Sequence, residues 1–376
     1  GAGTEIASYL VGVERVLALE PLSVEVRTYR PFAPLLSKLA MVSVVPRSAP
    51  ETITVPVGTG SYRIARSDAT RVEMTRAPRS WRGDPRVGTL VFVVVPSPVE
   101  RLRLLLTGGV DVAADLDESA VAALGREDCC RSLVHPGSTI EYLHLSDVVV
   151  PFRDRRVREA ADLAVDRPLY VAQAHGGLGQ PVGQMAAPGV FGHAPGLRPP
   201  LRDLARARGL LAEAGFPRGI DVELEHRPGR RADLIAAQLA AAGIRPTPPE
   251  SPSPDLSPRL HRGEVGFYFG GLVSPTAEAS DFLDGYAHTR DEARGYGASN
   301  HARYSSTRAD ALIEEASACF DLATRRDLLQ RAMGVVAGDR RFVPVASPYQ
   351  VFGVRRGVEF RPRFDMKLLG REIARR

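Results

Sequence analysis

The amino-acid sequence predicts an α/β protein that is large enough for two domains. The chain has 376 residues, and chains beyond about 250 residues commonly divide into domains. From about residue 156 onward, segments with helical apolar spacing alternate with short strands, which is the pattern of α/β folds. The first 150 residues are richer in strands, because apolar and polar residues alternate there.

The strand-rich part is expected to begin with a β-hairpin over residues 10–29. A short helix is predicted over residues 31–39, where Leu35, Leu36 and Leu39 stand at helical spacing. The remaining elements of this part are a strand at 42–45, a glycine-rich turn at 55–63, strands at 70–76 and 89–95, and a helix at 100–107.

In the second part, apolar residues three or four positions apart predict helices at 156–165, 201–214, 231–242, 309–318 and 324–336. Short apolar runs predict strands at 220–224, 265–272, 342–345 and 351–354. Gly215 and Gly243 follow two of these helices, at the position where glycine commonly ends a helix. We expect residues 176–200 to be irregular and residues 245–258, with six prolines, to form a loop.

Charge and cysteine content argue against several classes of protein. The net charge is +5 and the basic residues are interspersed with acids, so nucleic acid is not a favoured partner. Cys129, Cys130 and Cys319 form no zinc-binding pattern with histidines. No apolar stretch is long enough to span a bilayer. Residues 1–12 show no signal-peptide pattern, so one has been removed or the chain begins inside a larger protein.

The sequence offers no assembled catalytic motif, and we therefore expect a non-catalytic protein without a cofactor. Gly58-Thr59-Gly60 lacks the rest of a nucleotide-binding loop and is better explained as a tight turn. The eight histidines form no metal-binding helical pair, and no nucleophile elbow is present. Asp281 and Asp284 are three positions apart, which is explained equally well by the start of a helix near Ser280.

Several segments, taken in order, resemble the family 5 extracellular solute-binding proteins, which include dipeptide- and oligopeptide-binding components of ABC transporters. The turn Val55-Pro-Val-Gly-Thr-Gly-Ser-Tyr is similar to the family's P-x-G-T-G-P-Y. The stretch Pro151-Phe-Arg-Asp-Arg-Arg-Val-Arg-Glu-Ala, followed by Asp166-Arg, resembles the family's most recognisable motif. Further resemblances are Trp81-Arg-Gly-Asp-Pro, Leu106-Thr-Gly-Gly-Val-Asp-Val, Leu210-Leu-Ala-Glu-Ala-Gly-Phe and Asn300-His-Ala-Arg-Tyr.

The resemblance implies a two-lobed, periplasmic-binding-protein-like fold of type II with a hinge made of two crossover segments. We place the crossovers near residues 143–151 and 342–348. Lobe I then comprises residues 1–146 and 346–376, and lobe II comprises residues 149–343. The family's usual N-terminal part of lobe I has no counterpart before the hairpin, so we expect a fragment or a naturally shortened relative.

The resemblance also implies a ligand site after the central strand of lobe II. Peptide binders of the family carry W-x-x-D-x-x-D-P there, whereas the matching stretch of this chain has no Trp and has Pro275 about where the ammonium-binding Asp would stand. Without that carboxylate, a charge-assisted hydrogen bond worth about 1.5–3 kcal/mol is lost. The candidate ligand-binding residues are Ser146, Met185, Tyr268, Phe269, Gly271, Ser274, Thr276, Glu278, Asp281 and Asn300, and plain packing explains each about as well.

The function implied is that of a substrate-binding protein of an ABC importer, which captures a peptide or other small polar solute in an interlobe cleft. Such a protein is expected to be a monomer, periplasmic or extracytoplasmic, with or without a lipid anchor, and to deliver its solute to permease subunits in the membrane. Two alternatives remain open at this point. One is a ligand-sensing domain of a regulatory or signalling protein, which an upstream DNA-binding or kinase module would indicate. The other is a hydrolase, which turnover dependent on Glu278 or Asp281 would indicate.

Overall fold

The computed structural model describes residues 9–50, 52–54, 56–78, 80–226, 229–247 and 256–375. The chain divides into two compact units, and both are discontinuous in sequence. Unit 1 comprises residues 1–42 and 138–348, and unit 2 comprises residues 43–137 and 349–376. These boundaries differ from those of the predicted lobes, because residues 1–42 pack with 138–348. Which residues enclose a ligand as lobe I and lobe II stays a prediction.

Unit 1 is built around an antiparallel sheet in which β8 (Thr139–Leu145) lies between β12 (Phe267–Val273) and β13 (Phe342–Arg355). A short strand, β9 (Gly179–Pro181), also pairs with β13. The parallel pair β10 (Ile220–Glu223) and β11 (Ile244–Thr247) lies beyond β12, to which Glu225 connects it through backbone hydrogen bonds with Phe267 and Phe269.

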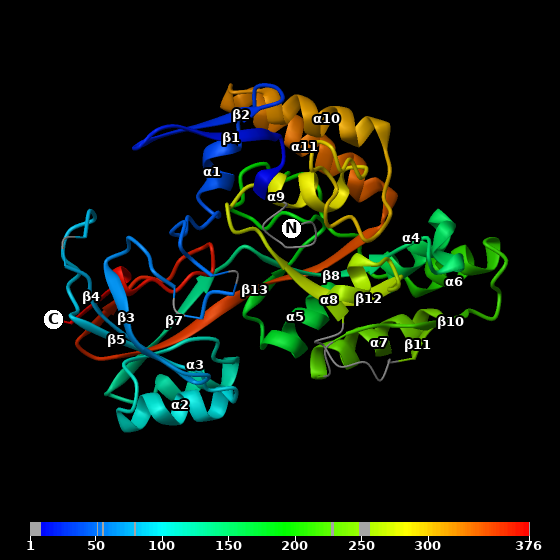
Figure 1. Ribbon diagram of the computed structural model, residues 1–376. Helices are drawn as coiled ribbons and strands as arrows, with labels where there is room; N and C mark the ends of the chain where they lie inside the picture. Colours follow the sequence, from blue (N-terminus) through cyan, green and yellow to red (C-terminus); the bar gives the residue numbers. More distant parts are fainter. Residues whose placement is uncertain are drawn as a thin grey trace. The chain divides into compact units, whose positions relative to one another are not determined.

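One face of this sheet is covered by four helices that share a core with it. They are α4 (Arg155–Ala164), α5 (Arg167–His175), α6 (Leu204–Glu213) and α7 (Arg230–Ala242). Leu143, Leu145 and Phe267 face this core, together with Val157 and Ala161 of α4. Figure 1 shows α4 and α6 side by side, and these two helices are in extensive contact. The helical spacing of Val157, Ala160, Ala161 and Ala164 thus produces the buried face of α4.

The remaining helices of unit 1 come from both ends of its sequence. The helices α10 (Thr307–Ala318) and α11 (Leu322–Asp339) pack against each other, as Figure 1 shows. The N-terminal hairpin, β1 (Val13–Glu20) and β2 (Ser23–Thr28), is joined to α10 by the ion pair of Arg30 with Glu314. Smaller helical elements are α1 (Leu35–Leu39), a 3-10 turn at Val150–Arg153, α8 (Leu256–His261), α9 (Ser280–Phe282) and a π-helical turn at Leu283–Ala287.

Unit 2 contains a three-stranded antiparallel sheet and a second set of strands around the end of β13. The sheet consists of β3 (Tyr62–Ser67), β4 (Arg71–Arg76) and β5 (Thr89–Val93). The C-terminal half of β13 pairs with β7 (Cys130–Pro136) and β6 (Val112–Ala113). Phe352, Val354, Val358 and Phe360 form a small core there. The other elements are α2 (Pro98–Thr107), α3 (Glu118–Leu124), β14 (Val358–Phe360), a 3-10 turn at Gly370–Glu372 and β15 (Ile373–Arg375).

Most of the predicted elements are confirmed, and three predictions need correction. The strand expected at 42–45 does not form, and Val44 is exposed there, so that segment has no buried face. The two strands expected at 342–345 and 351–354 are one continuous strand, β13. The register of β13 against β8 shifts between Pro344 and Ala346. This shift accommodates Pro344, because proline has no N–H group to donate to the neighbouring strand. The expected helix at 31–39 begins only after its N-cap, Pro34.

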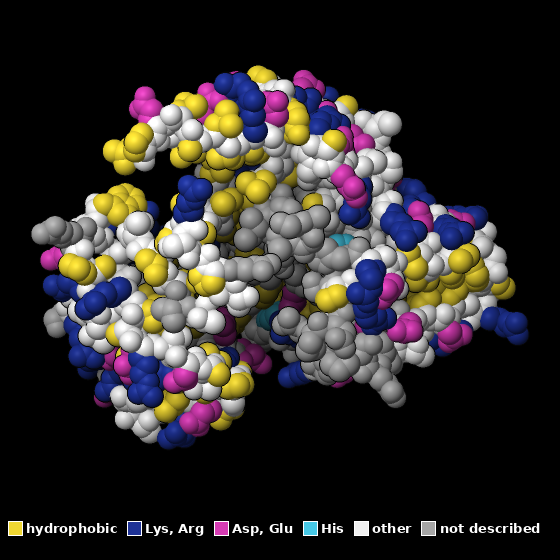
Figure 2. Space-filling view, viewed as in Figure 1, with side chains coloured by type: hydrophobic (Ala, Val, Ile, Leu, Met, Phe, Trp, Pro, Cys, Tyr) yellow, Lys and Arg dark blue, Asp and Glu magenta, His cyan; other side chains and the backbone are white. Residues whose placement is uncertain are grey.

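Two further points concern segments where no helix or strand was predicted. Helix α5 was not predicted, although Asp166 caps it and Pro168 stands in its first turn. Of the loop expected at 245–258, residues 248–255 lie outside the described residues, while 244–247 form β11 and 256–261 form α8. Figure 2 shows Lys and Arg side chains mixed with Asp and Glu over the viewed face, without one basic stripe.

Candidate functional site

Three of the candidate ligand residues lie on β12, and the strand directs them to opposite faces of the sheet. Phe269 and Gly271 stand opposite Leu143 and Glu141 of β8, on the face that α4–α7 cover. Tyr268 stands opposite His144, on the other face. A ligand on one face of the sheet therefore cannot contact the side chains of both Tyr268 and Phe269.

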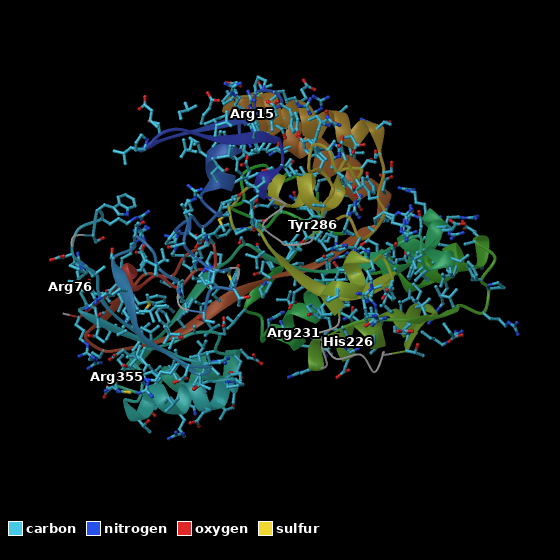
Figure 3. The ribbon with its side chains drawn as sticks, in the orientation of Figure 1. Arg15, Arg76, His226, Arg231, Tyr286 and Arg355 are labelled. Carbon is cyan, nitrogen blue, oxygen red and sulfur yellow. The ribbon has the colours of Figure 1, made fainter. Side chains whose placement is uncertain are left out.

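Tyr268 belongs to a buried aromatic cluster. Its hydroxyl group shares a hydrogen bond with that of Tyr142, and its ring stacks on His144 with centroids 4.6 Å apart. Burial raises the pKa of both tyrosines and lowers the pKa of His144 to about 3. The three side chains are therefore uncharged at neutral pH. Tyr286, a residue of the π-helical turn that Figure 3 labels, also raises the pKa of both tyrosines.

The turn that follows β12 is closed by its own polar groups. The backbone N–H of Ser274 donates to the carbonyl of Ser138 at 3.2 Å. The N–H and hydroxyl groups of Thr276 donate to one carboxylate oxygen of Asp281, at 3.0 and 2.8 Å. Burial raises the pKa of Asp281, against the opposing effect of Lys38 and of these hydrogen bonds. Thr276 and Asp281 thus hold the shape of this turn.

Glu278 lies in a buried network of charges. Its carboxylate forms an ion pair with Arg325 of α11, and both side chains are less than 10% exposed. Burial raises the pKa of Glu278, although Arg325 opposes the shift. Lys38 of α1 lies nearby, 3.0 Å from Asp284. Burial alone would lower the pKa of Lys38, but the surrounding carboxylates outweigh it and raise this pKa.

Ser146 and Met185 also have contacts within unit 1. The hydroxyl of Ser146 donates to the carbonyl of Ala302 at 3.3 Å and is fully buried. Met185 is 2% exposed and lines a very small apolar cavity with Met333 and Phe342. Ligand contact by these residues, as by those of β12 and its turn, stays a prediction.

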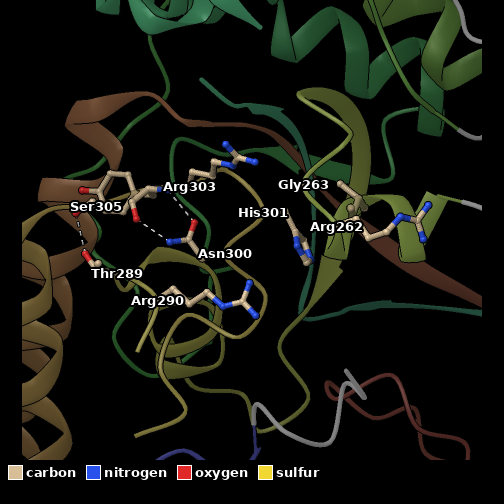
Figure 4. Close-up of a pocket in the computed structure, with 10 residues that line it drawn as sticks. Arg262, Gly263, Thr289, Arg290, Asn300, His301, Arg303 and Ser305 are labelled. Carbon is tan, nitrogen blue, oxygen red and sulfur yellow. Dashed lines mark hydrogen bonds between the residues drawn. The ribbon is translucent and has the colours of Figure 1, made fainter. Parts of the chain in front are cut away.

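Asn300 is the candidate residue that lines an open cavity, which has a volume of about 330 Å³ (Figure 4). Its amide nitrogen donates to the carbonyls of His288 and Tyr304, at 3.0 and 2.7 Å. Its amide oxygen accepts the N–H of Tyr304 at 2.9 Å. With both ends of the amide engaged, Asn300 shapes the wall of the cavity.

The cavity brings together polar residues from three separate segments. Arg262 follows α8, Thr289 and Arg290 follow the π-helical turn, and residues 300–305 precede α10. Arg262 pairs with Glu264 at 2.5 and 3.0 Å, and Arg290 pairs with Glu292 at 3.1 Å. In Figure 4, His301 lies between Arg290 and Arg262. Sequence reasoning missed these arginines, because no spacing in the chain connects the three segments.

A second polar cluster that the sequence did not indicate surrounds Glu141 of β8. The carboxylate is almost fully buried and accepts hydrogen bonds from the hydroxyl of Tyr170 at 2.8 Å and from Nε2 of His175 at 2.8 Å. Arg231 of α7, labelled in Figure 3, donates to its other oxygen at 2.7 Å. Burial would raise the pKa of Glu141, but these donors outweigh it and lower the pKa.

Neither cluster resembles a metal centre. Among the residues that the structure describes, no three His, Cys, Asp or Glu side chains are placed to hold a metal ion together. Within the same described ranges, no helix combines the length and the apolar character that crossing a membrane requires. The cavity around Asn300 instead offers hydrogen-bond donors on a preformed concave surface, which is the chemistry of solute binding.

The fold is the α/β fold of periplasmic binding proteins. Compared with the periplasmic binding protein DppA of Helicobacter pylori, solved in complex with the peptide STSA, the structure has a TM-score of 0.87. The sequences are 21% identical, and the alignment covers 98% of this chain and 76% of that one. The chain belongs to the bacterial extracellular solute-binding proteins, family 5, whose middle-region profile matches residues 3–294. The predicted family and fold class are thus confirmed.

Two individual relatives are similar in sequence over most of this chain. The heme-binding protein A of Haemophilus influenzae is 25% identical over 316 residues, which are 81% of this chain and 57% of that protein. The dipeptide-binding protein of Escherichia coli is 23% identical over 316 residues, which are 81% of this chain and 58% of that protein. The chain therefore spans less than two thirds of the length of these two relatives.

Proposed function

We propose that this protein is the substrate-binding component of an ABC importer and captures a peptide or another small polar solute outside the cytoplasm. The observation that carries the proposal is the family match over residues 3–294. The open polar cavity around Asn300 is in keeping with it, because binding requires preformed donors and acceptors and no reacting groups. The proposed partners are the permease subunits that accept the solute at the membrane.

The proposed ligand class follows from the relatives and from one departure in the sequence. The relatives include a dipeptide-binding protein, and a structural relative was solved with the peptide STSA. In this chain, Pro275 stands about where peptide binders place an ammonium-binding carboxylate, and the nearby Glu278 and Asp281 are engaged within the protein. We therefore propose a solute whose recognition depends less on a free amino terminus than on its other polar groups.

The proposed contact residues are the polar and aromatic groups at the end of β12 and around the cavity. Several of them are buried, so solute contact at Tyr268, Ser274 or Ser146 requires these side chains to become accessible when the ligand enters. A ligand that binds one conformation of the protein better shifts the population toward it. Gly271, Thr276 and Asn300 need less rearrangement, because each is partly exposed.

A thermal-shift screen tests the proposal directly. The library should contain di- and tripeptides, N-acetylated peptides, heme and sugars. One class should raise the melting temperature saturably, because a ligand at 100 times its Kd stabilises the folded state by about 2.7 kcal/mol. That ligand should then stimulate ATP hydrolysis by the cognate permease in proteoliposomes. A folded protein that responds to no class would contradict the proposal.

A further inference from the structure

The cavity around Asn300 carries a positively charged group that the protein does not neutralise. Three arginines line it: Arg262, Arg290 and Arg303. Glu264 pairs with the first and Glu292 with the second. The guanidinium of Arg303 has no ion-pair or hydrogen-bond partner among the described residues. One net positive charge is therefore left at the cavity.

The backbone holds Arg303 in an unusual conformation. Its φ angle is +52°, in the left-handed region that residues with a Cβ atom adopt only with strain. Asn300 maintains this conformation, because its side-chain amide binds both the N–H and the carbonyl group of Tyr304, the residue after Arg303. Gly263 adds a second constraint. A Cβ atom on Gly263 would stand 3.1 Å from one terminal nitrogen of Arg303, so the missing side chain leaves room for the guanidinium.

Two hydroxyl groups complete the polar wall. The hydroxyl of Thr289 donates to that of Ser305 at 3.1 Å, which leaves the proton of Ser305 available to another acceptor. The N–H of Thr289 is held by Asp310, so this segment is fixed to α10. A charged donor and a hydroxyl donor thus line the same cavity, which Figure 4 shows with its polar side chains.

We propose that this cavity binds a small solute through one carboxylate group, with Arg303 as the charged donor and Ser305 as a hydroxyl donor. A single net positive charge matches a carboxylate better than a phosphate dianion. The volume of about 330 Å³ is at the lower end of the range for small-molecule sites, so the solute is small. Every lining residue lies in unit 1. The proposal deepens the proposed function, because this cavity is among the proposed solute contacts, but its binding test needs no importer.

The test uses a matched pair of probes, N-acetylalanine and its neutral N-methylamide, with inorganic phosphate as a third probe. Binding is followed by isothermal titration calorimetry at low ionic strength. N-acetylalanine should bind saturably, the methylamide should bind at least about tenfold more weakly, and 0.5 M NaCl should weaken the binding of the acid.

Arg303→Gln is the test variant, since glutamine meets the same backbone requirement at φ +52° without the charge. It should weaken N-acetylalanine binding about tenfold or more. Arg308→Gln, an exposed arginine on α10 outside the cavity, is the matched control and should bind as the wild type does. Circular dichroism melting shows that each variant is folded.

Three results would overturn the assignment. The first is equal binding of the acid and the methylamide. The second is Arg303→Gln binding within twofold of the wild type. The third is Arg303-dependent binding of phosphate without binding of N-acetylalanine, which would assign the site to a free inorganic anion. The methylamide comparison and the salt dependence need no variant, so the proposal remains testable even if Arg303→Gln fails to fold. A failed solute screen for transport would leave these outcomes unchanged.

Discussion

The ammonium group of Lys38 lies 3.0 Å from the carboxylate of Asp284, and the two side chains are 2% and 1% exposed. The two residues are far apart in sequence, since Lys38 belongs to α1 and Asp284 to the π-helical turn after β12. Their ion pair fixes α1 to the π-helical turn, and the pair of Glu278 with Arg325 fixes the loop that carries several candidate ligand residues to α11.

Replacing Lys38 by Met should destabilise unit 1 by about 3–5 kcal/mol, because it leaves buried carboxylates without their cation. Urea unfolding measures the change. The double variant Lys38→Met/Asp284→Leu should recover much of the loss, since an apolar pair leaves no uncompensated charge. Lys367, the only other lysine, is exposed, and Lys367→Met should change stability by less than about 0.5 kcal/mol. A single Lys38→Met variant as stable as the wild type would refute the role of the pair.

His144 should make the protein sensitive to mild acid. Burial lowers its pKa to about 3 in the folded state, against an ordinary value of 6.5. Between these values the unfolded chain binds a proton that the folded protein does not, so stability falls as the pH decreases below 6.5. The expected loss is up to about 1.4 kcal/mol per pH unit.

Urea unfolding at pH 7, 5 and 4 tests this prediction with His144→Phe, which should show a flatter pH dependence than the wild type. His135→Phe, at a more accessible histidine, should keep the wild-type dependence. If His144→Phe and the wild type lose stability in parallel, the acid sensitivity comes from other groups.

Asn300→Ala should act mainly on stability. It removes three hydrogen bonds that shape the segment 300–304 and should cost about 2–3 kcal/mol. Asn300→Asp keeps an acceptor for Tyr304 and should lose less. Thermal melting and N-acetylalanine binding are measured together. Unchanged melting with weakened binding would show that Asn300 contacts the ligand and does not only shape the cavity.

Glu141→Gln should destabilise unit 1 by about 1.5–3 kcal/mol at neutral pH, because three donors lose a charged acceptor. The pKa of Glu141 is lowered in the folded state, so the difference between wild type and variant should shrink as the pH falls through that pKa. Arg231→Gln should cost less than about 1 kcal/mol, because the Arg231 side chain is 59% exposed. A larger effect for Arg231→Gln than for Glu141→Gln would contradict this arrangement.

The sequence predicted the fold correctly where the spacing of apolar residues indicates which side chains are buried. Apolar spacing predicted α4, α7, α10 and α11, and the alternation near the start predicted β1 and β2. It failed at β13, where two apolar runs predicted separate strands at 342–345 and 351–354 but the structure has one continuous strand. It also missed α5, because Pro168 was not recognised as a first-turn residue.

The candidate site was less accessible to sequence reasoning. The family resemblance pointed to β12 and the turn after it, but periodicity does not show that Glu278 faces Arg325 or that Asp281 closes the turn on Thr276. The cavity depends on three segments that only the tertiary fold brings together, and its unpaired charge, on Arg303, depends on a backbone angle that no pattern in the chain encodes.

The interleaving of the two units has a consequence for biosynthesis. Unit 2 needs the last half of β13 as the partner of β7, and that half is synthesised long after β7. Neither unit can therefore finish folding while the chain is still short, and long-range strand pairing of this kind is slow. In a nascent polypeptide, more than half of the chain must be synthesised after β7 before its strand partner is available. Until then β7 has an unpaired edge, which is a natural contact for chaperones.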